Sequence, residues 1–327
     1  MPGALGYAYH EANRGEHLAQ YFLTALGVSA PVIRQEDIGI DFYCALARNE
    51  DKRLTFHSPF MVQHGAVSKD FIYGGYREQK WRNYELKWLF TQELPLFVCT
   101  TDREAVRFRL YSTSAMWLVH YQFGDSIAQV ELCPDAHHDP LRESRCSEMV
   151  GPVEARTGVA YRIPLGNPVV DLTINDLESY SRNRAIETIR IAVDVEQTNL
   201  TFRRLGVHVA SWLTSVSPND PDSLKVCGGS IFWNSTQGKN ITSQLDALKN
   251  IALTLAMNFS AQNANTQLEH LAPVFRLFTK ADIPDWMLPE LPKLVLNNLQ
   301  DQQPVALAPG LQGAVGITVS QIGKAQR

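Results

Sequence analysis

The sequence predicts an α/β protein in which a mixed sheet flanked by helices is followed by a mainly helical C-terminal domain. Residues 11–26 repeat apolar side chains at helical spacing and stop at Gly27, a common helix terminator. Short apolar runs at 41–47 and 96–100 have the length and composition of strands. Residues 243–258 return to helical spacing, which places helices in the second half of the chain.

The N-terminal domain is expected to span residues 8–130 and to alternate helices with strands. After the first helix come short segments rich in β-branched and aromatic residues, and then a helix at 81–92 whose apolar members include Trp81 and Trp88. Pro95 precedes an uninterrupted apolar run that is typical of a buried strand. The predicted strands are 32–35, 41–47, 60–63, 96–100, 107–111 and 117–121.

A polar stretch separates this domain from the rest, and we take residues 131–160 as a connecting segment. The accessory domain then covers residues 161–300, with a strand at 169–174 followed by helices. The predicted helices are 183–195, 201–213, 243–258 and 266–279. Residues 301–327 are rich in Gln, Ala, Gly and Pro, and are expected to form a flexible tail.

Composition is that of an ordinary globular protein. The chain has 327 residues, 45% of them hydrophobic and 20% charged, and its net charge is -4. Any nucleic-acid surface would therefore be a local basic patch. The N-terminus lacks a signal-peptide pattern, no run is apolar enough for a membrane helix, and the five cysteines are scattered, so a cytoplasmic location is expected.

Two polar residues are candidates for a metal site. Asp41 follows Gly39 and Ile40 at the start of one predicted strand, and Gln63 ends another about twenty residues later. If the two strands are adjacent and antiparallel, both side chains can lie on one face of the sheet. Carboxylate and amide oxygens are the ligands that hard divalent cations take, so this pair could hold such a cation.

These residues also carry a resemblance to a known family. Glu16 lies on the first helix, Asp41 closes Gly-Ile-Asp, Gln63 closes Val-Gln, and the 81–92 helix leads through Glu-Leu-Pro-Leu into the next strand. In order and spacing, residues 10–120 resemble the bacterial domain-of-unknown-function family 4365, a branch of the PD-(D/E)xK nuclease superfamily. The resemblance implies a restriction-endonuclease-like mixed sheet and covers roughly a third of the chain.

The family implies a metal-dependent endonuclease, that is, a phosphodiester hydrolase. Asp41 would bind Mg2+ or Mn2+ directly, Gln63 or its neighbouring backbone carbonyl would be a second ligand, and Glu16 would reach the metal through water. Family members carry a lysine two residues after the glutamine, where this chain has Gly65. The resemblance leaves Lys69 as a replacement catalytic lysine. His64 is a poorer one, since alternation along a strand turns it away from Gln63.

Basic residues around the second predicted helix are candidates for contact with nucleic acid. Lys80, Arg82 and Lys87 are interleaved with aromatic residues and could follow a phosphate backbone, although such charges also form ordinary solvated helix faces. The segment that starts at Cys133 holds metal-ligand residue types without the paired cysteine spacing of a zinc site. It is interpreted as a polar linker.

The leading hypothesis is a nuclease that hydrolyses DNA, which the resemblance associates with defence against phage or plasmid DNA. The alternative is a degenerate nuclease fold without catalysis that binds nucleic acid or a partner in a defence complex. A third possibility is a scaffold subunit that acts through its helical half. DNA is the expected partner of the first, no membrane is expected, and a homodimer is the default assembly.

Overall fold

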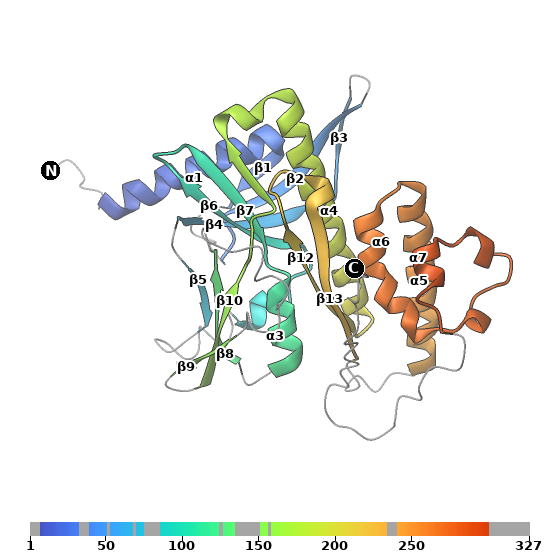
Figure 1. The fold of residues 1–327 in the computed structure, drawn as a ribbon. Coiled ribbons are helices and arrows are strands. Elements are labelled where there is room, and N and C mark those ends of the chain that lie inside the picture. The colour runs from blue at the N-terminus through green and yellow to red at the C-terminus, as the bar shows by residue number, and fades with distance from the viewer. Residues whose placement is uncertain are drawn as a thin grey trace, which may run out of the picture. The chain divides into compact units, whose positions relative to one another are not determined.

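The computed structural model describes residues 7–32, 39–50, 53–67, 70–74, 86–123, 127–134, 151–155, 158–233 and 241–300. The chain divides into two compact units, the first formed by residues 1–197 and 212–225, the second by residues 198–211 and 226–327. The helices in the described part of the chain are all too short or too polar to cross a membrane. The fold is mixed α/β (Figure 1).

The first unit is built on a seven-stranded sheet whose main path is β1-β2-β4-β6-β7-β11, with β3 paired to β2. β4 and β6 are parallel, and every other neighbouring pair in this sheet is antiparallel. The strands are β1 (Gly27–Pro31), β2 (Phe42–Glu50), β3 (Arg53–Phe56), β4 (Phe60–Ala66), β6 (Leu96–Asp102), β7 (Arg107–Ser112) and β11 (Val170–Thr173). The order along the chain is α1, strands β1 to β4 of this sheet, strand β5 of a second sheet, a helical segment at 86–89, and the parallel strand β6.

Helix α1 (Tyr7–Leu26) covers one face of this sheet. Its apolar stripe is buried, and the Phe22 ring stacks on Phe108 of β7 with ring centres 5.5 Å apart. Nearer the start of the helix, Gly15 lies against His64 of β4 and Thr101 of β6. The helical period predicted for 11–26 is confirmed, and the helix ends where Gly27 begins β1.

A second sheet, with strand order β5-β8-β10-β9, packs on the opposite face. Its strands are β5 (Phe71–Gly74), β8 (Ile127–Cys133), β9 (Gly151–Ala155) and β10 (Gly158–Pro164). One hydrophobic core joins Met61 and Val98 of the main sheet to Tyr73 and Val130 of the second. Helix α3 (Ala115–Phe123) adds Met116 and Trp117 to the same core.

Helix α4 (Ser179–Arg204) and strands β12 (Val207–Ser215) and β13 (Leu224–Trp233) belong partly to each unit. The rest of the second unit is helical, with α5 (Ile241–Ala261), α6 (Asn265–Leu271), a 3-10 segment (Ala272–Leu277) and α7 (Lys293–Leu296). Its core contains Phe202, Leu248, Phe275 and Val295. Two short 3-10 turns, Ile174–Leu177 and Pro221–Ser223, belong to the first unit.

Two of the predicted elements are wrong. Residues 117–121, expected as a strand, lie inside helix α3. Residues 201–213, expected as a helix, contain the end of α4 and most of β12. Gly206 separates these two elements in the left-handed conformation, and its amide donates to the Arg203 carbonyl in a helix-ending turn. The connecting segment 131–160 holds the end of β8 and all of β9, and the tail 301–327 lies outside the described residues.

Candidate active site

Asp41 lies where β2 begins, between β1 and β4. Its amide donates to the Val62 carbonyl at 3.0 Å, and its carbonyl accepts from the Val32 amide at 2.8 Å. Gly39 has a φ of 88° and lies against Trp88, so a glycine is required at the turn that leads into this strand. The Asp41 carboxylate is half-buried, and its Oδ2 accepts from the backbone amide of His64 at 2.7 Å.

Gln63 lies on the neighbouring strand β4. The antiparallel register pairs Phe42 with Val62 and Tyr43 with Met61, and Asp41 directly precedes the first paired residue of β2. Its bonds to the Val62 carbonyl and the His64 amide place Asp41 beside the segment of β4 that holds Gln63. The Gln63 side chain lies towards the second sheet, where its Oε1 accepts from the Tyr73 hydroxyl.

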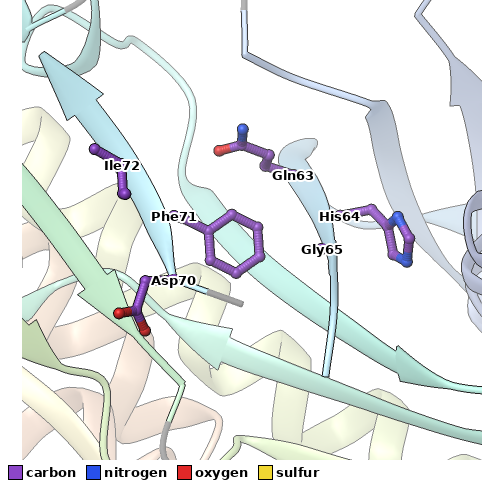
Figure 2. A pocket seen from close by; sticks show the side chains of 6 residues that line it. All are labelled: Gln63, His64, Gly65, Asp70, Phe71 and Ile72. Atoms are coloured by element: carbon purple, nitrogen blue, oxygen red, sulfur yellow. The ribbon is translucent and has the colours of Figure 1, made fainter. Parts of the chain in front are cut away.

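His64 lies on the other face of β4, as strand alternation requires (Figure 2). Its Nε2 is 2.8 Å from Thr101 Oγ1, and the Thr101 hydroxyl donates to the Gly15 carbonyl at 3.4 Å. These contacts connect His64 to Gly15 of α1. Glu16 is the next residue of that helix and is half-buried. Glu16 therefore lies on the helix that covers the His64 face, whereas the Gln63 side chain lies on the opposite face.

Gly65 faces the same side as Gln63 and is covered by an aromatic ring. A Cβ placed on Gly65 would be 2.7 Å from Cζ and 3.0 Å from Cε1 of Phe71. Such distances are far inside van der Waals contact, so no side chain fits at this position while the ring stays in place. Together with Gln63 and Gly65, residues of β4 and β5 line a cavity of about 260 Å³ (Figure 2). Its other lining residues are His64, Asp70, Phe71 and Ile72.

The remaining predicted site residues are basic. Lys69, Lys80 and Arg82 lie outside the described residues. Lys87 is exposed within the helical segment 86–89, on the side opposite the buried Leu86 and Leu89. A solvent-exposed lysine is available for contact with a phosphate, but it is also the ordinary state of a lysine.

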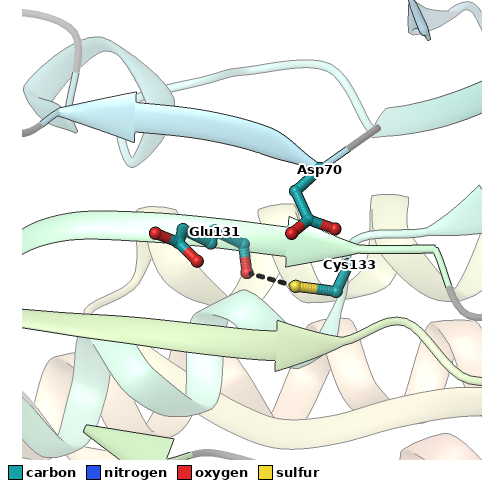
Figure 3. Close-up of side chains that lie close together, drawn as sticks. All are labelled: Asp70, Glu131 and Cys133. Atoms are coloured by element: carbon teal, nitrogen blue, oxygen red, sulfur yellow. Dashed lines mark hydrogen bonds between the residues drawn. The ribbon is translucent and has the colours of Figure 1, made fainter. Parts of the chain in front are cut away.

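A second group of ligand-type side chains was missed by the sequence reasoning. The group consists of Asp70, Glu131 and Cys133 (Figure 3). Each offers one ligand atom, and these three atoms lie within 4.8 Å of one another. The alternation in β8 places Glu131 and Cys133 on the outer face of the second sheet, opposite the buried Val130 and Leu132. That alternation was visible in the sequence, but the pairing of β5 with β8 that adds Asp70 was not.

Arg162 of β10 balances the charge of this second group. Its Nη2 is 3.0 Å from Asp70 Oδ2, and its Nε is 3.1 Å from Glu131 Oε2. Burial and the nearby Asp70 charge raise the pKa of the Cys133 thiol to about 11, so the thiol is protonated at neutral pH. The group has ligands for a divalent cation, but both of its carboxylates are already paired with the Arg162 guanidinium.

The two groups differ in what they offer a cation. Asp41 and Gln63 provide a carboxylate and an amide oxygen from adjacent strands, which suits Mg2+ or Mn2+. The second group includes a thiol, which suits softer metals. Comparison of the chain with protein-family models, with curated proteins and with solved structures finds no match. The resemblance to the nuclease family therefore rests on the residues named above.

Proposed function

We propose that this protein is a PD-(D/E)xK-type nuclease that hydrolyses phosphodiester bonds in DNA with Mg2+ or Mn2+, in defence against foreign DNA such as phage or plasmid DNA. One observation carries the proposal: the Asp41 amide bonds the Val62 carbonyl and the Asp41 carboxylate bonds the His64 amide, so Asp41 lies beside the segment of β4 that holds Gln63. The mixed sheet that follows α1, with β2 antiparallel and β6 parallel to β4, supports it, because the resemblance implies a mixed sheet.

In this proposal Asp41 and Gln63 would hold the metal. Glu16, expected to reach the metal through water, lies on the helix that covers the opposite face of β4 from the Gln63 side chain, so it is not assigned to this ion. The bound ion supplies a Lewis acid that activates water and neutralises charge on the phosphate. The His64 amide restricts the orientation of the Asp41 carboxylate by donating to Oδ2. Lys69 is the proposed source of the catalytic ammonium, and Lys80, Arg82 and Lys87 are proposed to contact the DNA backbone.

The test is nicking of a supercoiled plasmid with Mg2+ or Mn2+, comparing the wild type with Asp41→Asn. Asparagine keeps an oxygen that accepts from the His64 amide but removes the charge, so folding is preserved and metal binding is not. Cleavage should fall at least about 100-fold, since several kcal/mol of transition-state stabilisation depend on the ion. Asp246→Asn, at an exposed position of α5, is the matched control and should leave cleavage unchanged. Equal cleavage by the wild type and Asp41→Asn contradicts the proposal.

A second candidate function is favoured by the ring over Gly65. Because Phe71 fills the space where a side chain at 65 would begin, position 65 supplies no cation to a transition state. The alternative is therefore a degenerate nuclease fold that binds nucleic acid or a partner in a defence complex. It predicts that the wild type binds DNA without cleaving it under any divalent cation, and that this binding weakens steeply with salt.

A further inference from the structure

Tyr73 is held firmly at the point where the two sheets of the first unit meet. Its side chain is only 1% exposed and packs in the core that contains Met61 and Val98. Met61 lies two residues before Gln63 on β4, and Val98 of β6 pairs with Gln63, so both lie on the same face of the sheet as Gln63. The backbone of Tyr73 pairs with Val130 of β8, which fixes the position of the ring along β5.

The next residue, Gly74, prevents this strand from shifting. It has a φ of 77°, and a Cβ there would be 2.6 Å from the Ala128 carbonyl oxygen and 2.8 Å from Leu86 Cδ1. β5 is therefore packed closely at the point where it ends. The Tyr73 hydroxyl has a fixed location, from which it donates to Gln63 Oε1.

A carboxamide can turn about its last torsion and exchange its oxygen for its NH2 group at little cost. A cation binds only the oxygen. A fixed hydroxyl that donates to the amide holds the oxygen towards it. The same hydroxyl can accept from the NH2 group, so it favours one orientation of the amide without excluding the other. The oxygen keeps a second lone pair that a ligand can use.

We propose that Tyr73 is the positioning residue for the candidate metal site: it orients the Gln63 carboxamide so that the oxygen stays available to a divalent cation bound at Asp41. This inference rests on the proposed function, because it assigns Gln63 to the metal. Residues that orient a metal ligand through a hydrogen bond contribute about 10- to 100-fold to metal affinity. This role could not be predicted from local patterns, since β5 joins the site only through the packing of the two sheets.

The experiment measures Mn2+ affinity of the full-length protein by electron paramagnetic resonance of the free ion. Tyr73→Phe should weaken Mn2+ binding at least about 10-fold while the thermal unfolding curve stays cooperative. Tyr111→Phe is the matched control. Tyr111 is also 1% exposed in the same core, but it lies on β7, where its hydroxyl contacts Thr100 and Arg109. It should leave Mn2+ affinity unchanged.

A double-mutant cycle separates orientation from general damage to the core. In the Gln63→Leu background, Tyr73→Phe should cause no further loss of affinity, because the amide that it orients is gone. Mn2+ affinity unchanged or increased in Tyr73→Phe overturns the inference while the metal site stands. Mn2+ affinity equal in the wild type and in Asp41→Asn overturns the proposed site, and the role of Tyr73 with it.

Discussion

Gly65→Ala tests the packing that separates this site from one with a side chain at position 65. The added Cβ would meet Cζ, Cε1 and Cε2 of Phe71 at 2.7, 3.0 and 3.4 Å, whereas carbon atoms in contact are normally about 3.5–4.0 Å apart. The ring would have to move by several tenths of an ångström in a core where it is only 6% exposed. Overpacking of this kind costs about 1–3 kcal/mol.

An opposing effect reduces this cost. Replacing a strand glycine by alanine recovers about 0.5–1 kcal/mol of backbone entropy when the conformation allows a side chain, and Gly65 is not among the glycines with positive φ. The net expectation is a loss of about 1–2 kcal/mol in the free energy of unfolding. Urea denaturation followed by circular dichroism measures it.

The control for this prediction is the same substitution in a Phe71→Leu background. Leucine removes the ring atoms that clash, so Gly65→Ala should there be neutral or stabilising, and the two substitutions should couple by at least about 1 kcal/mol. An equal effect of Gly65→Ala in both backgrounds would show that the ring does not restrict position 65. The Phe71 ring would then give no support to a degenerate site.

Two further predictions concern charge. Burial lowers the pKa of His270 from 6.5 to about 3, so the unfolded chain binds a proton that the folded one does not, and the free energy of unfolding should fall by about 1.4 kcal/mol per pH unit below 6.5. When the free energy of unfolding is measured as a function of acid pH, His270→Leu should flatten this slope, whereas the control His17→Gln, at an exposed position, should leave it unchanged. An unchanged slope in His270→Leu contradicts the lowered pKa of His270. Asp171→Asn should cost about 1–2 kcal/mol in urea denaturation, because the half-buried guanidinium of Arg109 loses its charged partner at 3.1 Å; unchanged stability contradicts this.

Local patterns predicted four consecutive strands along the path of the main sheet, β2, β4, β6 and β7, but not β1 or β3. Phe60–Gln63 and residues 96–100 are apolar runs bounded by turn residues, and both lie in strands. The run at 117–121 has a similar composition but forms a helix, because a short apolar run does not distinguish a buried strand from a buried helix. Its start is set by the Thr113 and Ser114 carbonyls, which accept from the amides of the first helical turn.

Gly206 was the signal that the prediction of a helix at 201–213 overlooked. The residues after it alternate β-branched and other side chains in Val-His-Val, a strand pattern, and a glycine before such a pattern is a typical helix end. The prediction followed helical spacing from 201 without treating this glycine as a stop. The left-handed φ of 76° at Gly206 shows why the helix could not continue.

In the candidate site, some contacts join segments that are close in the chain and others join segments that are far apart. Asp41 and Gln63 lie close together in the chain, and the prediction that their two segments are adjacent and antiparallel is confirmed for β2 and β4, although the charged turn after β2 leads into β3 and not directly into β4. Tyr73 and Phe71 reach Gln63 and Gly65 only because β5 pairs with β8, some sixty residues later, and the second sheet then packs on the first. The aromatic and β-branched residues Phe71, Ile72 and Tyr73 are typical of a strand, but they were not among the predicted strands.

β5 is therefore the element on which the interpretation of the site depends. Phe71 and Tyr73 of β5 contact Gly65 and Gln63 of β4. Asp70, which directly precedes β5, pairs instead with Arg162 on the outer side of the second sheet. The same strand covers position 65 and orients Gln63, so it removes one catalytic position while it supports another. A protein selected only to lose activity would have no need to keep the Gln63 oxygen oriented, and the Mn2+ affinity of Tyr73→Phe measures whether that orientation has a function.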